Sequence, residues 1–214
     1  MPSPPPPTAW YSGGMATDYR FGEGLHGRHV VSVSGQDKEA LFAELARAAS
    51  SELTGVSPEE INGRLWDRER MLSTRLADHA AMPHAQFEEI DDTVVIVAIC
   101  PDGIVYDAHR SELIHVAFCI VGDQANHLDT LSGVAVRLQV TGVLDAIVRA
   151  AREGDRELVH RLLTSPPDTE APDADRGAAR RSARAQRVWR QALQLAPLVG
   201  ARCILLHTSS TQAK

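Results

Sequence analysis

Two stretches of the chain are hydrophobic at almost every position rather than at every second or third one. They cover residues 93 to 99 and 113 to 121, read TVVIVAI and LIHVAFCIV, and are rich in β-branched side chains. A strand with both faces covered gives this continuous pattern, whereas a strand with one wet face alternates. The two runs therefore predict neighbouring central strands. HVVSVSG at 29 to 35 predicts a short strand, and PDGIVYDA at 101 to 108 predicts a turn followed by another.

Helical spacing of apolar residues marks the segments around these runs. One helix is predicted after the N-cap residue Asp37, with its apolar face at Leu41, Phe42, Leu45 and Ala49. A second begins at Ser57, where a proline takes the first helical position and Glu60 completes a capping box. Further helices are predicted from His127 onwards and through TGVLDAIVRAAREGDRELVHRLL, with a break at Gly154. The alternation predicts an α/β fold in which a mixed β-sheet is sandwiched between helices.

The two ends of the chain differ in composition from its middle. Residues 1 to 28 are rich in proline and glycine, which predicts a flexible N-terminal tail. Residues 29 to 163 carry the strand and helix patterns and form the predicted main domain. Residues 164 to 184 predict a charged, proline-rich linker, whose arginine cluster suits either an acidic partner or a solvated helix. Residues 185 to 214 predict a helix-strand extension or the start of a further domain.

Composition and charge exclude several classes of function. The chain has 214 residues, 43% of them hydrophobic, so it can bury a substantial core. Its net charge of −6 does not favour a nucleic-acid partner. The three cysteines are widely spaced, which indicates neither a disulfide framework nor a zinc site. Neither a signal-peptide pattern nor an apolar run of membrane-spanning length occurs, so we expect a cytoplasmic protein without direct membrane insertion.

Two histidines are candidates for chemistry. His84 follows Met82 and Pro83, and the proline ring restricts the backbone on both sides of that bond. A neutral imidazole held in this way is a nucleophile near physiological pH, although a Pro-His pair also occurs in ordinary loops. His127 follows the second apolar run and opens a helix, and helix N-termini at such positions attract phosphate.

The other histidines fit structural roles better. His115 lies inside an apolar run, where a buried structural histidine is expected. His26 and His29 have a spacing that suits a metal ion, but neither a carboxylate nor a cysteine lies close by in sequence. A solvated loop is therefore the prediction there, and we expect neither a metal nor another cofactor.

Several segments in combination resemble one known family. Arg68 and Glu69 end a helix, Ser73 and Thr74 follow in a loop, and a Pro-His pair closes the segment at His84. Further on come DGIVYDA, HVAFCIVG, an NHL tripeptide and a helical ELVHRLL. Together they resemble the fructose/mannitol-type (type 2) enzyme IIA domain of the bacterial phosphoenolpyruvate:sugar phosphotransferase system, including its nitrogen-regulatory branch. The resemblance runs from about residue 31 to residue 163.

This resemblance implies a site and a set of partners. His84 would carry a phosphoryl group, Arg68 would bind the phosphoryl oxygens, and His127 would hydrogen-bond to the same group. Ser73 or Thr74 would hold the loop or donate to the phosphate. An HPr-like phosphocarrier protein would be the donor, an unidentified protein would be the regulated partner, and a homo-oligomer is possible.

The loop before His84 departs from the family pattern. Many members have several glycines there, whereas this chain reads RLADHAA, with Arg75, Ala77 and His79. Glycine lets the backbone approach a phosphate closely, so a differently shaped loop is expected. Two hypotheses remain: a phosphohistidine carrier with a regulatory role, or a noncatalytic enzyme IIA-like sensor or interaction module that has lost phosphotransfer.

Overall fold

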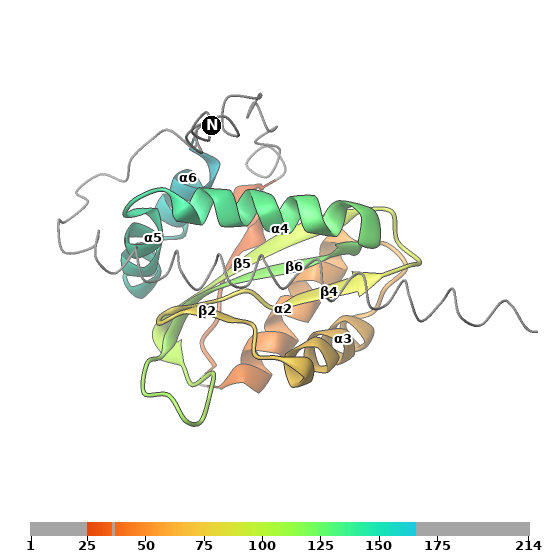
Figure 1. Ribbon diagram of the computed structural model, residues 1–214, viewed down its shortest axis with the longest axis horizontal. Helices are drawn as coiled ribbons and strands as arrows, with labels where there is room; N and C mark the ends of the chain where they lie inside the picture. The colour runs from red at the N-terminus through yellow and green to blue at the C-terminus, as the bar shows by residue number, and fades with distance from the viewer. Residues whose placement is uncertain (1–24, 36, 166–214) are drawn as a thin grey trace, which may run out of the picture.

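The structure is a computed structural model, and it describes residues 25 to 35 and 37 to 165 (Figure 1). The strands are β1 (Val30–Ser32), β2 (Arg75–Ala77), β3 (Ala80–Ala81), β4 (His84–Phe87), β5 (Thr93–Ile104) and β6 (Ile114–Asp123). The α-helices are α2 (Lys38–Glu52), α3 (Pro58–Met71), α4 (Gln124–Gln139), α5 (Val143–Arg152) and α6 (Arg156–Thr164). A 3-10 turn, η1 (Gly27–His29), precedes β1.

The strands form one mixed six-stranded sheet, which confirms the predicted α/β class. Its centre is the antiparallel pair β5 and β6, the two continuous apolar runs of the sequence. β1 pairs parallel to β5, while β3 and β4 both pair parallel to β6, and β2 pairs antiparallel to β3. Ala80 lies opposite Val116 and His84 lies opposite Ile120, so residues 80 to 87 follow β6 along its length.

Helices cover both faces of the sheet, as Figure 1 shows. Alternate residues of the central strands belong to two separate cores. Val97 and Phe118 pack in the core that includes α4, α5 and α6, while Ile96 and Cys119 pack in the core that includes α2 and α3. The central strands are hydrophobic at almost every position because each of their faces is buried.

Two predicted helix starts are confirmed, whereas the helix expected from His127 onwards begins three residues earlier, at Gln124. The Asp37 side chain accepts a hydrogen bond from Ala40 N at the start of α2. Ser57 and Glu60 form the reciprocal capping box at the start of α3. The predicted break between the last two helices is also present, and Gly154 there has a φ of 73°.

Two local predictions differ from the structure. The stretch after the first apolar run is not a separate turn and strand, because β5 continues through it to Ile104. The ladder shifts register between Ile99 and Ile104, and Gly103 takes a φ of 79°, so an irregularity absorbs the turn-like sequence within one long strand. The loop before His84 contains the short antiparallel pair β2 and β3, which sequence patterning did not indicate.

Predictions for the chain ends fall mostly outside the described residues. Leu25, which lies in the expected tail, is buried against the core that includes α6. Residues 1 to 24 and 166 to 214, with the rest of the tail, nearly all of the linker and the helix-strand extension, lie outside the description. Among the described helices, none alone has the length and hydropathy to cross a membrane; residues 129 to 139 and 143 to 152 pass that test only as a pair bent by 91°.

Candidate active site

His84 begins β4, and its ring is held by two contacts. Its Nδ1 lies 3.0 Å from the carbonyl oxygen of Met82, and its Nε2 lies 3.0 Å from Nε of Arg68. Since a carbonyl oxygen only accepts, Nδ1 carries the proton and Nε2 carries the lone pair. The guanidinium N-H donates to that lone pair. The geometry therefore selects one tautomer and leaves Nε2 as the basic, nucleophilic nitrogen.

Arg68 lies in the last turn of α3 and reaches across to β4. Its Nη1 donates to the carbonyl oxygen of Leu72 at 2.9 Å, so the guanidinium is held at two points. Burial lowers the pKa of Arg68, and the neighbouring Glu69 carboxylate opposes that shift. An arginine remains charged under these conditions. Arg70, two residues on, instead forms an exposed ion pair with Asp67 at 2.6 Å.

His127 lies in the first turn of α4, beside His84 at the start of β4. Its ring centroid is 5.2 Å from that of His84, and it is fully buried. Among the described residues, neither of its ring nitrogens has a hydrogen-bond partner. Buried polar atoms are rarely left unsatisfied, so these two nitrogens make His127 a candidate for binding a ligand.

Both histidines are held in the neutral form. Burial lowers the pKa of His84 to about 4, and burial together with the charge that His84 would acquire lowers the pKa of His127 to about 4. At neutral pH the site therefore has two uncharged imidazoles beside one guanidinium. That combination favours an anion that Arg68 attracts and that the Nε2 lone pair of His84 can attack.

Ser73 and Thr74 turn to carboxylates rather than to the histidines. Ser73 Oγ donates to Asp107 at 3.2 Å. Thr74 donates to Glu69 through both its backbone N-H, at 2.9 Å, and its hydroxyl, at 2.6 Å. Of the two roles expected for this pair, these contacts suit loop support.

A buried polar group next to Arg68 was not assigned a role from the sequence. Glu69 contacts Lys38, Thr74 and Tyr106, which come from α2, the loop after α3 and the segment after β5. Two local sequence features could have pointed to this group: Glu69 stands beside Arg68 in the family pattern, and Tyr106 stands in the DGIVYDA segment. Lys38 gave no such signal because only folding brings it there.

The glycine-free loop forms a pinned hairpin. Arg75 donates to the carbonyl oxygens of Asp78 and Glu112. His79 Nδ1 bonds to the carbonyl oxygen of Leu113 at 2.9 Å, and its Nε2 lies 3.2 Å from Nη2 of Arg152. These contacts tie the hairpin to the segment before β6 and to α5. His115, predicted to be structural, is buried with its Nδ1 3.0 Å from the carbonyl oxygen of Cys100.

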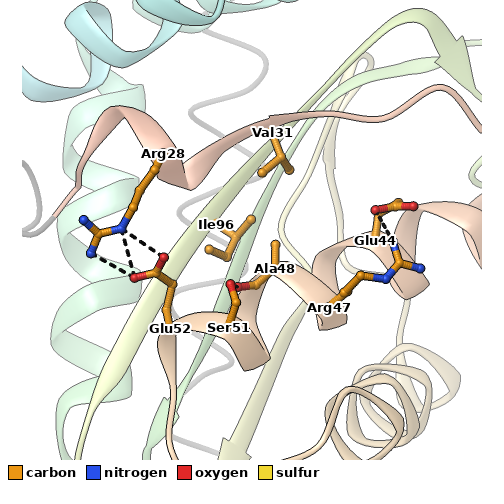
Figure 2. Close-up of a pocket in the computed structure, with 8 residues that line it drawn as sticks. All are labelled: Arg28, Val31, Glu44, Arg47, Ala48, Ser51, Glu52 and Ile96. Atoms are coloured by element: carbon orange, nitrogen blue, oxygen red, sulfur yellow. Dashed lines mark hydrogen bonds and ion pairs between the residues drawn. The ribbon is translucent and has the colours of Figure 1, made fainter.

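A hollow lies away from these histidines, between α2 and the β1 edge of the sheet (Figure 2). It has a volume of about 360 Å³ and is floored by Val31 and Ile96. Its charged side chains pair with one another: Arg28 with Glu52 at 2.9 Å, and Arg47 with Glu44 at 2.5 Å. Such internal pairing leaves no charge directed at a ligand. Within residues 25 to 35 and 37 to 165, no three His, Cys, Asp or Glu side chains are grouped to hold a metal ion.

Comparison with known proteins identifies the family. Residues 26–163 match the family described as "Phosphoenolpyruvate-dependent sugar phosphotransferase system, EIIA 2". The match covers more than half of the chain, so the protein belongs to this enzyme IIA family, as the sequence resemblance predicted.

Related sequences come from both branches of that family. The chain is 33% identical over 88 residues to the mannitol-specific phosphotransferase enzyme IIA component of Staphylococcus aureus, an alignment that covers 39% of this chain and 58% of that protein. It is 26% identical over 137 residues to a nitrogen regulatory protein of Bradyrhizobium diazoefficiens, covering 63% of this chain and 87% of that protein. The chain thus spans under two thirds of the Staphylococcus relative but most of the Bradyrhizobium one.

Solved structures share the fold. The crystal structure of nitrogen regulatory protein IIA-Ntr from Neisseria meningitidis superposes with a TM-score of 0.58 at 21% identity, covering 68% of this chain and 99% of that one. IIA mannitol from Escherichia coli gives 0.52 at 19% identity, covering 65% and 98%. A complex of enzyme IIAMTL with phosphorylated enzyme IIBMTL from Escherichia coli also gives 0.52, at 18% identity, covering 65% and 96%.

Proposed function

We propose that the protein is a phosphohistidine carrier with a regulatory role, which accepts a phosphoryl group on Nε2 of His84 from an HPr-like phosphocarrier protein. The observation that carries this proposal is the meeting of Arg68, His84 and His127, which lie on α3, β4 and α4. These three residues are far apart in sequence, and packing alone gives no reason for two neutral imidazoles and a guanidinium to lie next to one another.

The proposed reaction is an in-line transfer between two histidines. The lone pair on Nε2 of His84 attacks phosphorus as the N-P bond of the donor breaks, and the bonding pair returns to the imidazole of the donor. The Nδ1 proton stays on Nδ1, where it is donated to the carbonyl oxygen of Met82, so the ring needs no change of tautomer. Catalysis then depends on position and on charge around the phosphoryl oxygens.

Arg68 and His127 would bind the transferred group. Arg68 Nε now donates to Nε2 of His84, and during transfer it would move to a phosphoryl oxygen, for which a guanidinium has a suitable fork of donors. His127 would supply a ring N-H to another oxygen, which satisfies a buried nitrogen that has no other partner among the described residues.

The regulatory part rests on similarity to nitrogen regulatory proteins. Under this proposal the phosphorylation state of His84 is read by a protein partner. A cytoplasmic location and self-association remain predictions.

A noncatalytic sensor is the second candidate. The observation in its favour is the pinned hairpin at residues 75 to 81, which replaces the glycine-rich loop found in many relatives. A domain with this loop could keep the fold and the pocket while binding a partner without accepting phosphate.

The test is incubation with phosphoenolpyruvate, enzyme I and HPr, followed by measurement of acid-labile phosphate. We expect the wild type and the His109→Gln variant, which alters an exposed loop histidine, to be labelled, and His84→Gln to remain unlabelled. Equal labelling of His84→Gln and the wild type would show that another residue is the carrier. If all three proteins are folded and unlabelled, the sensor is the better description.

A further inference from the structure

A buried carboxylate, Glu69, follows Arg68 directly in α3. Glu69 is 7% exposed, yet both of its oxygens have partners. Oε1 accepts from Lys38 Nζ at 2.7 Å, and Oε2 accepts from the backbone N-H and hydroxyl of Thr74. The Tyr106 hydroxyl lies 2.7 Å from Thr74 Oγ1 and 3.2 Å from Glu69 Oε2. Lys38 also lies over the Tyr106 ring, 3.9 Å from its centroid.

In the group of four side chains, Lys38, Glu69, Thr74 and Tyr106, the Glu69 carboxyl is ionised and both of its oxygens are engaged. Burial alone would raise the pKa of Glu69, but the hydrogen bonds from Lys38 and Thr74 outweigh it and hold that pKa below its usual value. A buried ion pair is weak evidence for stability, because a well-packed apolar pair of similar volume often serves as well. Stability alone therefore does not explain the buried Lys38–Glu69 ion pair, and the backbone that it positions offers another explanation.

These charges hold the turn at residues 72 to 74, which contains a hydrogen-bond acceptor for Arg68. The Glu69 carboxylate accepts a hydrogen bond from the backbone N-H of Thr74, and Leu72 lies inside the turn that this contact closes. The Leu72 carbonyl oxygen accepts from Arg68 Nη1 at 2.9 Å, while Arg68 Nε contacts His84 Nε2. A continuous chain of contacts thus runs from the buried carboxylate through the turn to the nucleophilic nitrogen.

We propose that Glu69 is a positioning residue for phosphotransfer, acting with Lys38 and Tyr106 through the 72–74 turn to aim the Arg68 guanidinium at Nε2 of His84. The inference rests on the proposed function, in which Arg68 binds the phosphoryl oxygens. Glu69 itself does not touch the reacting atoms. Its negative charge also offsets the cost of burying Arg68, since the carboxylate lies next to it in the same helix turn.

The main test is a double-mutant cycle between Glu69→Gln and Arg68→Ala, measured as the rate of phosphoryl transfer from HPr. A misplaced arginine slows the maximal rate at saturating HPr, by about tenfold to a hundredfold, without a matching change in the half-saturating HPr concentration. In the Arg68→Ala background, Glu69→Gln should cost less than about twofold, because it acts through the removed arginine.

The matched control is Asp67→Asn. It makes the same change of charge in the same helix, at a carboxylate that is 63% exposed and pairs with Arg70. We expect its rate to stay within about twofold of the wild type. If Glu69→Gln does not fold, Tyr106→Phe removes only a hydroxyl from the group and should slow the maximal rate about threefold, again only when Arg68 is present.

Two outcomes would overturn the proposal. One is a Glu69→Gln rate equal to that of the wild type. The other is the same loss with and without Arg68, as a purely structural defect would give.

A spectroscopic readout separates this inference from the proposed function. The contact between the Arg68 side-chain N-H and the His84 ring can be followed by NMR in the wild type and in Glu69→Gln. If the wild type takes up no phosphate, the carrier proposal fails. Loss of the contact in Glu69→Gln would still support positioning by Glu69, whereas its retention would refute it.

Discussion

The pH dependence of stability gives a quantitative test of the site, because two buried histidines share it. In the unfolded chain a histidine has a pKa of about 6.5. In the folded protein burial lowers the pKa of both His84 and His127 to about 4. Between these values the unfolded chain binds more protons than the native one, so the free energy of unfolding falls as the pH falls.

The size of the effect follows from the two pKa values. Between pH 7 and pH 5 each histidine should remove about 2 kcal/mol from the free energy of unfolding, or about 4 kcal/mol for the pair. The contribution is fully present above the unfolded pKa and is lost as the pH approaches the folded one. Lost stability of this size is a large fraction of the 5 to 15 kcal/mol, roughly, that a typical domain has.

Urea unfolding at pH 7 and pH 5 measures this loss in the wild type and in the His84→Gln/His127→Gln double variant. Other groups titrate equally in both proteins, so the difference between the two losses isolates the pair. We expect the double variant to lose about 4 kcal/mol less than the wild type, and each single variant to fall between them. Losses that agree within about 0.5 kcal/mol would refute the claim that folding holds these imidazoles neutral.

Two further predictions concern the framework around the site. Phe118 is fully buried in the central strand β6, so Phe118→Ala should lower the free energy of unfolding by about 3 to 5 kcal/mol in urea titrations, and a loss under about 1 kcal/mol would contradict the core assignment. Ser57→Ala removes one half of the capping box of α3 and should cost about 1 kcal/mol. Ser51→Ala, at an exposed position near the end of α2, is its control, and equal losses in the two variants would argue against a special role for the cap.

The sheet and the helix starts could be predicted because their signals are local. The continuous apolar runs mark strands with two covered faces, and both became the central pair β5 and β6. Asp37 and Ser57 cap helices through groups three residues away, within the reach of a sequence pattern. The hairpin of β2 and β3 had no such signal. Its strands are only three and two residues long, and its anchors, such as the Glu112 carbonyl oxygen, lie more than thirty positions further along the chain.

The residues of the site likewise fall into those with a local sequence signal and those without one. Arg68, His84 and His127 were proposed from the sequence, two of them from local features and all three from the family resemblance, and the structure brings them together. Lys38 and Tyr106 were missed, because each contacts Glu69 across more than thirty residues of chain. Their importance depends on burial and distance, which no spacing rule encodes.

The position of the hairpin bears on whether the altered loop excludes phosphotransfer. Ala80 lies opposite Val116 and His84 lies opposite Ile120, so the turn at His79 is displaced from the nucleophile by more than four residues along β6, or about 13 Å at strand spacing. The Arg75 guanidinium reaches the Asp78 and Glu112 carbonyl oxygens, toward the same far end.

The groups around His84 Nε2 come instead from the ends of α3 and α4. The missing glycines therefore reshape a hairpin that contacts α5 and the segment before β6, and leave the surroundings of the nucleophilic nitrogen to other elements. The altered loop therefore gives little steric reason to think that the domain has lost phosphotransfer. Loss of activity, if it occurred, would have to be sought in how a donor protein docks around the site.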